Sequence, residues 1–94
     1  MEEQDVVRRH IATHPVRYRI ASMLLETSGS FAGDIAEKLE YDKRLITFHL
    51  MELEKYGLIE TKLEETGKET PIVDRFASPT ENLYRMEPFL SKFA

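Results

Sequence analysis

Residues 42–59 constrain the fold of this chain more than any other segment, because they read as a complete helix that runs into a strand. Asp42 is a favourable N-cap, since its carboxylate can accept a backbone N–H of the first turn. Apolar residues recur with helical spacing along one side, at Ile46, Leu50 and Leu53. Gly57 can adopt the positive φ that ends a helix at little cost, so the helix is predicted to stop there.

The other side of this helix begins with hydrogen-bond donors. Lys43, Arg44 and Thr47 lie in the first two turns, and we expect all three on the face opposite the apolar side. Donors at a helix N-terminus can contact DNA phosphates and base edges. Phe48 is unusual on such a face. It either contacts a thymine methyl group in the major groove or packs against a neighbouring helix or subunit.

Length and composition fit one small domain covering residues 1–94, of which 41% are hydrophobic. No apolar run approaches the roughly 18 residues that span a membrane, and no signal-peptide region follows the acidic N-terminus, so we expect a cytoplasmic protein. The absence of cysteine excludes disulfides and thiolate metal sites. We do not expect an enzyme, because the sequence has no Gly-rich phosphate loop, H-E-x-x-H motif or cysteine nucleophile.

The charge is acidic in total but unevenly distributed. A net charge of −4 argues mildly against strong nonspecific binding to DNA. No acid occurs between Asp5 and Glu26, however, and the stretch between them holds Arg8, Arg9, Arg17 and Arg19. These arginines either form a basic surface for DNA or solvate two helix surfaces. We expect a DNA contact from Arg17 in particular.

Hydrophobic spacing and chain breakers predict three further helices before residue 42. The first covers residues 5–13. The second begins at Pro15, which suits a first helical turn, and ends at residues 28–30. The third covers residues 32–39. Two short helices, a tight turn and a polar-faced helix make a helix-turn-helix, here placed at about residues 31–57.

A small β wing is expected after Gly57, at about residues 58–87, because the run that opens it alternates between apolar and charged side chains. Two segments are candidates for the return strand, 71–76 and 82–87, and we prefer the second. A short terminal helix is predicted at about residues 88–94. The fold class is therefore mainly α with a small β wing.

Three segments in this order, residues 14–20 (HPVRYRI), 34–39 (DIAEKL) and 42–59, resemble the ArsR-type winged helix-turn-helix regulators. The resemblance covers roughly residues 14–63, with a weaker echo at 83–86. It implies a winged helix-turn-helix fold in a DNA-binding protein. It also implies a role for His49, since the family pattern has a His before Leu at that place. Contact with DNA and burial with a backbone partner are the two alternatives for this side chain.

The turn before the recognition helix departs from the family pattern. Such turns usually carry glycine directly after the Leu, whereas Glu40 stands there in this chain. A non-glycine residue in the left-handed conformation costs on the order of 1 kcal/mol. We therefore expect a different turn geometry and a slightly tilted fourth helix.

The resemblance further implies that the first and last helices pair across a two-fold axis. The apolar residues expected in this interface are Val7, Ile11, Phe89, Leu90 and Phe93. A homodimer of this kind would set two recognition helices about one DNA turn apart, roughly 34–36 Å. The alternative is that the tail folds back on its own domain.

Metal sensing is not supported. His10 and His14 are spaced to share one helix face, and that spacing can hold a metal, but two ligands are too few. Metal-sensing members of the family place cysteines on the third helix, or histidines and acids on a long last helix. Residues 34–39 contain no cysteine, so we expect neither a metal nor another cofactor.

Two functions remain open at this point. The preferred one is a sequence-specific transcriptional regulator that binds double-stranded DNA as a homodimer. Its expected DNA contacts are Lys43, Arg44, Thr47, Phe48, His49 and Arg17. The alternative is a winged-helix module for protein–protein interaction, which the acidic total charge and the acidic wing favour.

Overall fold

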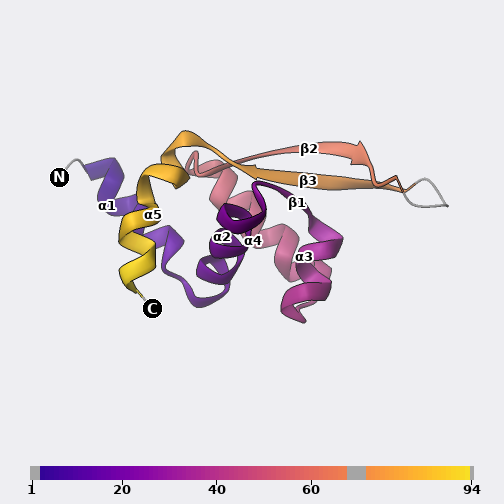
Figure 1. The fold of residues 1–94 in the computed structure, drawn as a ribbon, viewed down its shortest axis with the longest axis horizontal. Coiled ribbons are helices and arrows are strands. Elements are labelled where there is room, and N and C mark those ends of the chain that lie inside the picture. The colour runs from indigo at the N-terminus through magenta and orange to yellow at the C-terminus, as the bar shows by residue number, and fades with distance from the viewer. Residues whose placement is uncertain (1–2, 68–71, 94) are drawn as a thin grey trace.

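The computed structural model describes residues 3–67 and 72–93, and it gathers the helices on one side of a long β hairpin (Figure 1). In chain order the elements are α1 (Glu3–Ala12), α2 (Pro15–Thr27), β1 (Ser30–Phe31), α3 (Ala32–Leu39), α4 (Lys43–Lys55), β2 (Ile59–Glu65), β3 (Val73–Pro79) and α5 (Glu81–Phe93). The first four helices agree closely with the ranges that the sequence predicts.

Local capping explains where α2 and α4 begin and where α4 ends. The His14 ring accepts the Val16 N–H through Nδ1 at 3.2 Å, directly before Pro15 opens α2. Asp42 accepts the Arg44 N–H at 2.7 Å, which confirms it as the N-cap of α4. Gly57 follows α4 with a φ of 75°, as its position predicts.

The turn between α3 and α4 is left-handed in spite of its missing glycine. Glu40 has φ 60° and ψ 43°, so the expectation of a different turn geometry is wrong. The turn is held by two backbone hydrogen bonds. Glu40 donates to the Glu37 carbonyl at 3.3 Å, and Tyr41 donates to the Ala36 carbonyl at 3.0 Å. These bonds satisfy the last carbonyls of α3 and offset the strain at Glu40.

The sheet is antiparallel, with the strand order β1-β3-β2. Strands β2 and β3 form the wing hairpin, paired from Ile59 opposite Pro79 to Glu65 opposite Val73. The short strand β1 pairs Phe31 with Phe76, and their rings meet edge to face at 5.1 Å. Strand β1 was not predicted from the sequence.

The prediction of a return strand at residues 82–87 is wrong, as is that of a terminal helix confined to 88–94. The strand is β3, which overlaps the rejected candidate, and α5 covers the other segment. Leu83, Met86 and Leu90 recur with helical spacing and are all buried. Their burial keeps α5 helical through Pro88. A return strand at 82–87 would have made residues 65–81 an enlarged wing tip. Residues 68–71 of that segment lie outside the described residues.

One core joins the helices to the base of the hairpin. Its largest fully buried side chains include Ile20 and Leu24 of α2, Ile35 of α3 and Leu50 of α4, and α5 adds Leu83. The wing projects at one end of the molecule, and α1 and α5 lie at the other (Figure 1). This arrangement is a winged helix-turn-helix, mainly α with a small β wing, as the sequence predicts. In the described ranges no helix has both the length and the apolar character needed to cross a membrane.

Candidate nucleic-acid interface

One row of exposed side chains runs along the outer side of helix α4, and we call it the outward line of α4. Ile46, His49, Leu50 and Leu53 are buried, so the residues on the opposite side face solvent. That side carries Arg44, Phe48, Met51 and Lys55, spaced by four, three and four residues and all exposed. A cation therefore stands at each end of the line, with two large apolar side chains between them.

The structure brings together the donors predicted at the start of α4. Asp42, Lys43, Arg44 and Thr47 line a shallow hollow of about 520 Å³. Arg44 is exposed, and Thr47 is half-buried on the flank of the helix. The hollow lies at the helix N-terminus, where backbone N–H groups and the helix dipole favour negative charge.

Lys43 departs from the face predicted for it. Its ammonium lies 3.0 Å from Oδ1 of Asp74, so it points toward the first residues of β3 in the wing. Asp74 is only 8% exposed, and it also accepts the backbone N–H groups of Gly33 at 2.9 Å and Arg75 at 2.8 Å. Asp74 thereby connects the first turns of α3 and α4 to the wing.

These donors also determine how Asp74 titrates. Burial by itself raises the pKa of this carboxyl group. The Gly33 N–H, the Lys43 ammonium and the Arg75 N–H favour the charged form more strongly, so the pKa of Asp74 lies below its ordinary value of 3.8. The start of β3 consequently holds an ionised carboxylate at neutral pH.

Phe48 and His49 divide between the surface and the core. Phe48 is 54% exposed, and its ring meets the His49 ring edge to face at 5.1 Å. His49 is 4% exposed, and its ring lies 4.8 Å from that of His14. The burial of His49 places it behind Phe48, away from the surface that a direct DNA contact requires.

His49 is buried without the backbone partner that one of the two alternatives proposed. Its Nδ1 has no hydrogen-bond partner among the described residues. Burial lowers the pKa of His49 from 6.5, and the neighbouring His14 and Arg17 lower it further, against an opposing effect of Glu52. The neutral imidazole is therefore the form that the fold favours.

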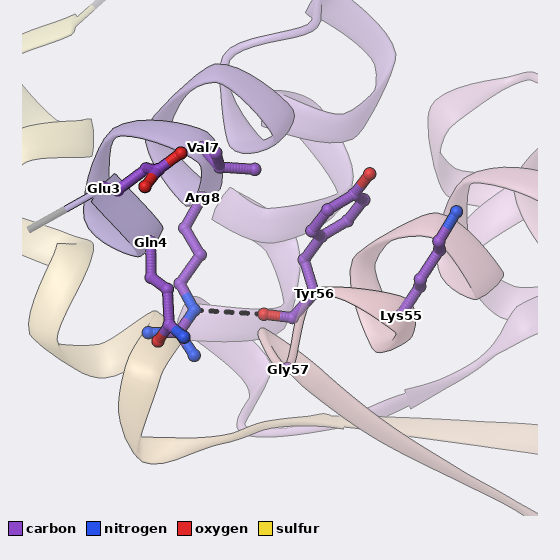
Figure 2. A pocket seen from close by; sticks show the side chains of 7 residues that line it. All are labelled: Glu3, Gln4, Val7, Arg8, Lys55, Tyr56 and Gly57. Atoms are coloured by element: carbon purple, nitrogen blue, oxygen red, sulfur yellow. Dashed lines mark hydrogen bonds between the residues drawn. The ribbon is translucent and has the colours of Figure 1, made fainter.

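The arginines of the basic stretch are largely used to hold the fold together. Arg8 donates through Nε to the Tyr56 carbonyl at 3.1 Å, which ties α1 to the end of α4 (Figure 2). Arg17 donates through Nε to the Ile11 carbonyl at 2.8 Å. Arg9 lies over the Phe89 ring at 4.5 Å, and Arg19 donates to the Tyr41 hydroxyl at 2.9 Å.

The residues predicted for a dimer interface fall into three groups. Val7 and Phe93 are exposed, and Ile11 and Phe89 are partly buried against the core. Leu90 is only 2% exposed, and the Tyr18 hydroxyl donates to its carbonyl at 3.0 Å. Leu90 therefore packs within its own chain, as expected if the tail folds back on its own domain, because α5 packs on α2.

His10 and His14 do not share a helix face, contrary to their spacing. His10 belongs to α1, whereas His14 caps α2 beyond the end of α1. Within residues 3–67 and 72–93, no three side chains of His, Cys, Asp or Glu gather as metal ligands would.

Two residues of this region, exposed Met51 and buried Asp74, were not predicted from the sequence. Met51 follows Phe48 by three residues and lies opposite the buried side of α4, so the helical spacing could have identified it. Asp74 could not have been found in this way, because its partners Gly33 and Lys43 lie on two other elements.

Comparison with known proteins places this geometry in a family. A family model described as a helix-turn-helix domain matches residues 12–62. No sequence match to a curated protein was found. A crystal structure of NadR in complex with 4-hydroxyphenylacetate is similar with a TM-score of 0.70 at 18% identity, over 96% of this chain and 64% of that one. This likeness supports the fold alone. Because the family match covers more than half of the chain, the protein belongs to the family of helix-turn-helix domains.

Proposed function

We propose that this protein is a sequence-specific transcriptional regulator that binds double-stranded DNA as a homodimer and does not sense metals. Its family and its winged fold support a general role in DNA-binding regulation. The proposal of sequence-specific binding to double-stranded DNA rests on the outward line of α4. This line begins with Arg44 and ends with Lys55, and its four exposed residues include no acid, whereas the two acids of this stretch, Glu52 and Glu54, are half-buried. A helix of this kind can enter the major groove of DNA.

The proposed base contacts are Arg44 and Thr47, in the first two turns of α4. Lys43 remains a candidate for a phosphate contact, because its side chain is 54% exposed although its ammonium pairs with Asp74. Arg17 remains a candidate as well, since its hydrogen bond to the Ile11 carbonyl is made through Nε alone. His49 is proposed to support Phe48 from beneath, because it is buried and in ring contact with it.

The homodimer is proposed to form through α1 and α5. The exposed apolar side chains Val7 and Phe93 favour this surface, together with the exposed faces of Ile11 and Phe89. Leu90 is left out of this interface because it is already buried. Two such chains would present two α4 helices to successive major grooves on one side of the DNA.

The test is a binding selection from random duplex DNA, followed by affinity measurements on the selected and a scrambled duplex at several salt concentrations. Arg44→Ala should lose about 1–3 kcal/mol on the selected duplex and relax the preference at one base position. Glu26→Ala is the control, because it removes an exposed charge near the end of α2, outside α4, the wing and the helices α1 and α5 that are proposed to dimerise. Equal binding of the wild type to both duplexes would contradict the regulator proposal.

A second candidate function, a module for protein–protein interaction, has one observation in its favour. The wing carries exposed acids and exposed apolar side chains, namely Glu60, Glu65, Leu63 and Val73. An acidic wing is poorly suited to phosphates. The same selection separates the two functions, because a protein-interaction module would enrich no DNA sequence.

A further inference from the structure

We propose that Phe48 and Met51 recognise the C5-methyl group of pyrimidines in the major groove, whether it belongs to thymine or to 5-methylcytosine. This inference rests on the proposed function and adds a specificity to it. Of the two roles considered for Phe48, it selects contact with a thymine methyl group over packing against a neighbouring helix or subunit. It extends the same role to Met51.

The exposure of the two side chains is the first argument. Phe48 is 54% exposed and Met51 is 50% exposed, although α4 is otherwise well packed on its inner side. Among the described residues the ring of Phe48 contacts that of His49 on the same helix, and more than half of its surface is exposed, so packing against a neighbouring helix, the other role considered for Phe48, is not supported. An aromatic ring held in this way keeps most of its apolar surface available to a ligand.

Their spacing is the second argument. Residues three apart in a helix are separated by about 4.5 Å along the axis, and they lie on the same side. Base pairs are stacked about 3.4 Å apart. Phe48 and Met51 can therefore reach neighbouring base pairs when α4 lies in the major groove, with Arg44 one turn before Phe48.

The chemistry of the groove is the third argument. Base edges in the major groove present hydrogen-bond donors and acceptors, and the thymine methyl group is the apolar feature among them. An apolar side chain that covers a donor or acceptor leaves it unsatisfied, which is unfavourable. The same side chain over a methyl group buries apolar surface on both partners. Phe48 and Met51 should therefore select the methylated pyrimidine and reject the bare one.

The charges beside these residues favour DNA over an apolar protein surface. Arg44 and Lys55 extend the same line on either side of the apolar pair, and both are exposed. Cations in these places complement the phosphates that border the groove. Several other basic side chains, including Arg8 and Arg19, are engaged within the fold. Apolar contact is thus expected to supply an unusually large share of the binding free energy.

The test uses the duplex obtained by selection, in which single thymines are replaced by deoxyuridine so that only the methyl group is lost. Fluorescence anisotropy should show about fourfold weaker binding for each methyl group that is contacted, the value of burying one methyl group. Where the site tolerates cytosine, 5-methylcytosine should bind more tightly than cytosine by a similar factor.

Two variants assign the effect to the side chains. Phe48→Ala and Met51→Ala should each bind the thymine and deoxyuridine duplexes equally at one position. Leu63→Ala is the matched control, because Leu63 is an exposed apolar residue of the wing, and it should retain the discrimination. If the wild type binds its selected duplex specifically but ignores the methyl groups, this inference is wrong and the proposed function stands. If it shows no preference for the selected duplex, both are wrong.

Discussion

At the scale of single residues, two buried titratable groups contribute to the pH dependence of stability in separate ranges. The pKa of Asp74 is lowered, so its contribution to stability is complete above 3.8 and is lost as the pH falls through the lowered value. The pKa of His49 is lowered from 6.5, so the unfolded state takes up this proton before the folded state does. Stability then decreases as the pH falls below 6.5 toward the lowered pKa. The two ranges can therefore be measured independently.

The first prediction follows from His49. The free energy of unfolding should decrease between pH 7.5 and 5.5 in the wild type, and His49→Gln should remove a large part of this decrease, because the titrating group is gone. Urea unfolding at several pH values between 7.5 and 5.5 measures the free energy of unfolding of each protein. His10→Gln, at an exposed position of α1, is the control and should keep the wild-type dependence. An identical dependence in the wild type and His49→Gln would show that His49 is not responsible.

At the scale of elements, the α3–α4 turn shows how far local sequence predicts structure. Asp42 and Gly57 sit at the ends of α4 as their chemistry predicts, because capping and positive φ depend on few residues. Glu40 is different. Its left-handed conformation is imposed by the backbone bonds that close α3, and those bonds overrule the preference of its side chain.

The second prediction concerns this turn. Glu40→Gly should raise the free energy of unfolding by about 0.5–1 kcal/mol, because glycine adopts positive φ without steric strain. Glu37→Gly is a matched control, since it makes the same substitution at an exposed position inside α3. It should lower the free energy of unfolding by about 1 kcal/mol. Chemical denaturation of both variants measures whether the free energy of unfolding rises or falls. A lower free energy of unfolding in Glu40→Gly would contradict the strain argument.

The return strand and α5 lay beyond what local sequence could decide. Residues 82–87 alternate well enough to resemble a strand, and Pro88 resembles a helix start. The helix prevails because Leu83, Met86 and Leu90 all reach the core, which depends on where α2 and β3 have already placed apolar surface. The Lys43–Asp74 pair is hidden for the same reason, since its two members come from different elements.

At the scale of the whole molecule, the fold separates three surfaces along an elongated body of 47 × 22 × 20 Å. The wing extends from one end, and α1 and α5 lie together at the other (Figure 1). The outward line of α4 belongs to the helical body between these ends. Association through α1 and α5 would leave both wings and the first turns of both α4 helices uncovered, while Val7 lies beside Lys55 at the end of α4.

The last prediction is that the chain forms a homodimer through α1 and α5. Val7→Asp should convert it to a monomer at micromolar concentration, because a carboxylate placed in an apolar interface would be buried without a partner. Val7 is exposed, so the substitution leaves the core of the single chain intact. Sedimentation velocity measures the change. Leu63→Asp, on an exposed apolar residue of the wing, is the control and should remain dimeric.

Binding to DNA gives this prediction a second readout. A dimer reads two half-sites, so the selected duplex should contain an inverted repeat with half-sites about 10 base pairs apart. Val7→Asp should bind this duplex more weakly, yet it should retain the base preference within each half-site, because α4 is unchanged. A wild type that sediments as a monomer and binds a single half-site would overturn the dimer while leaving the α4 contacts in place.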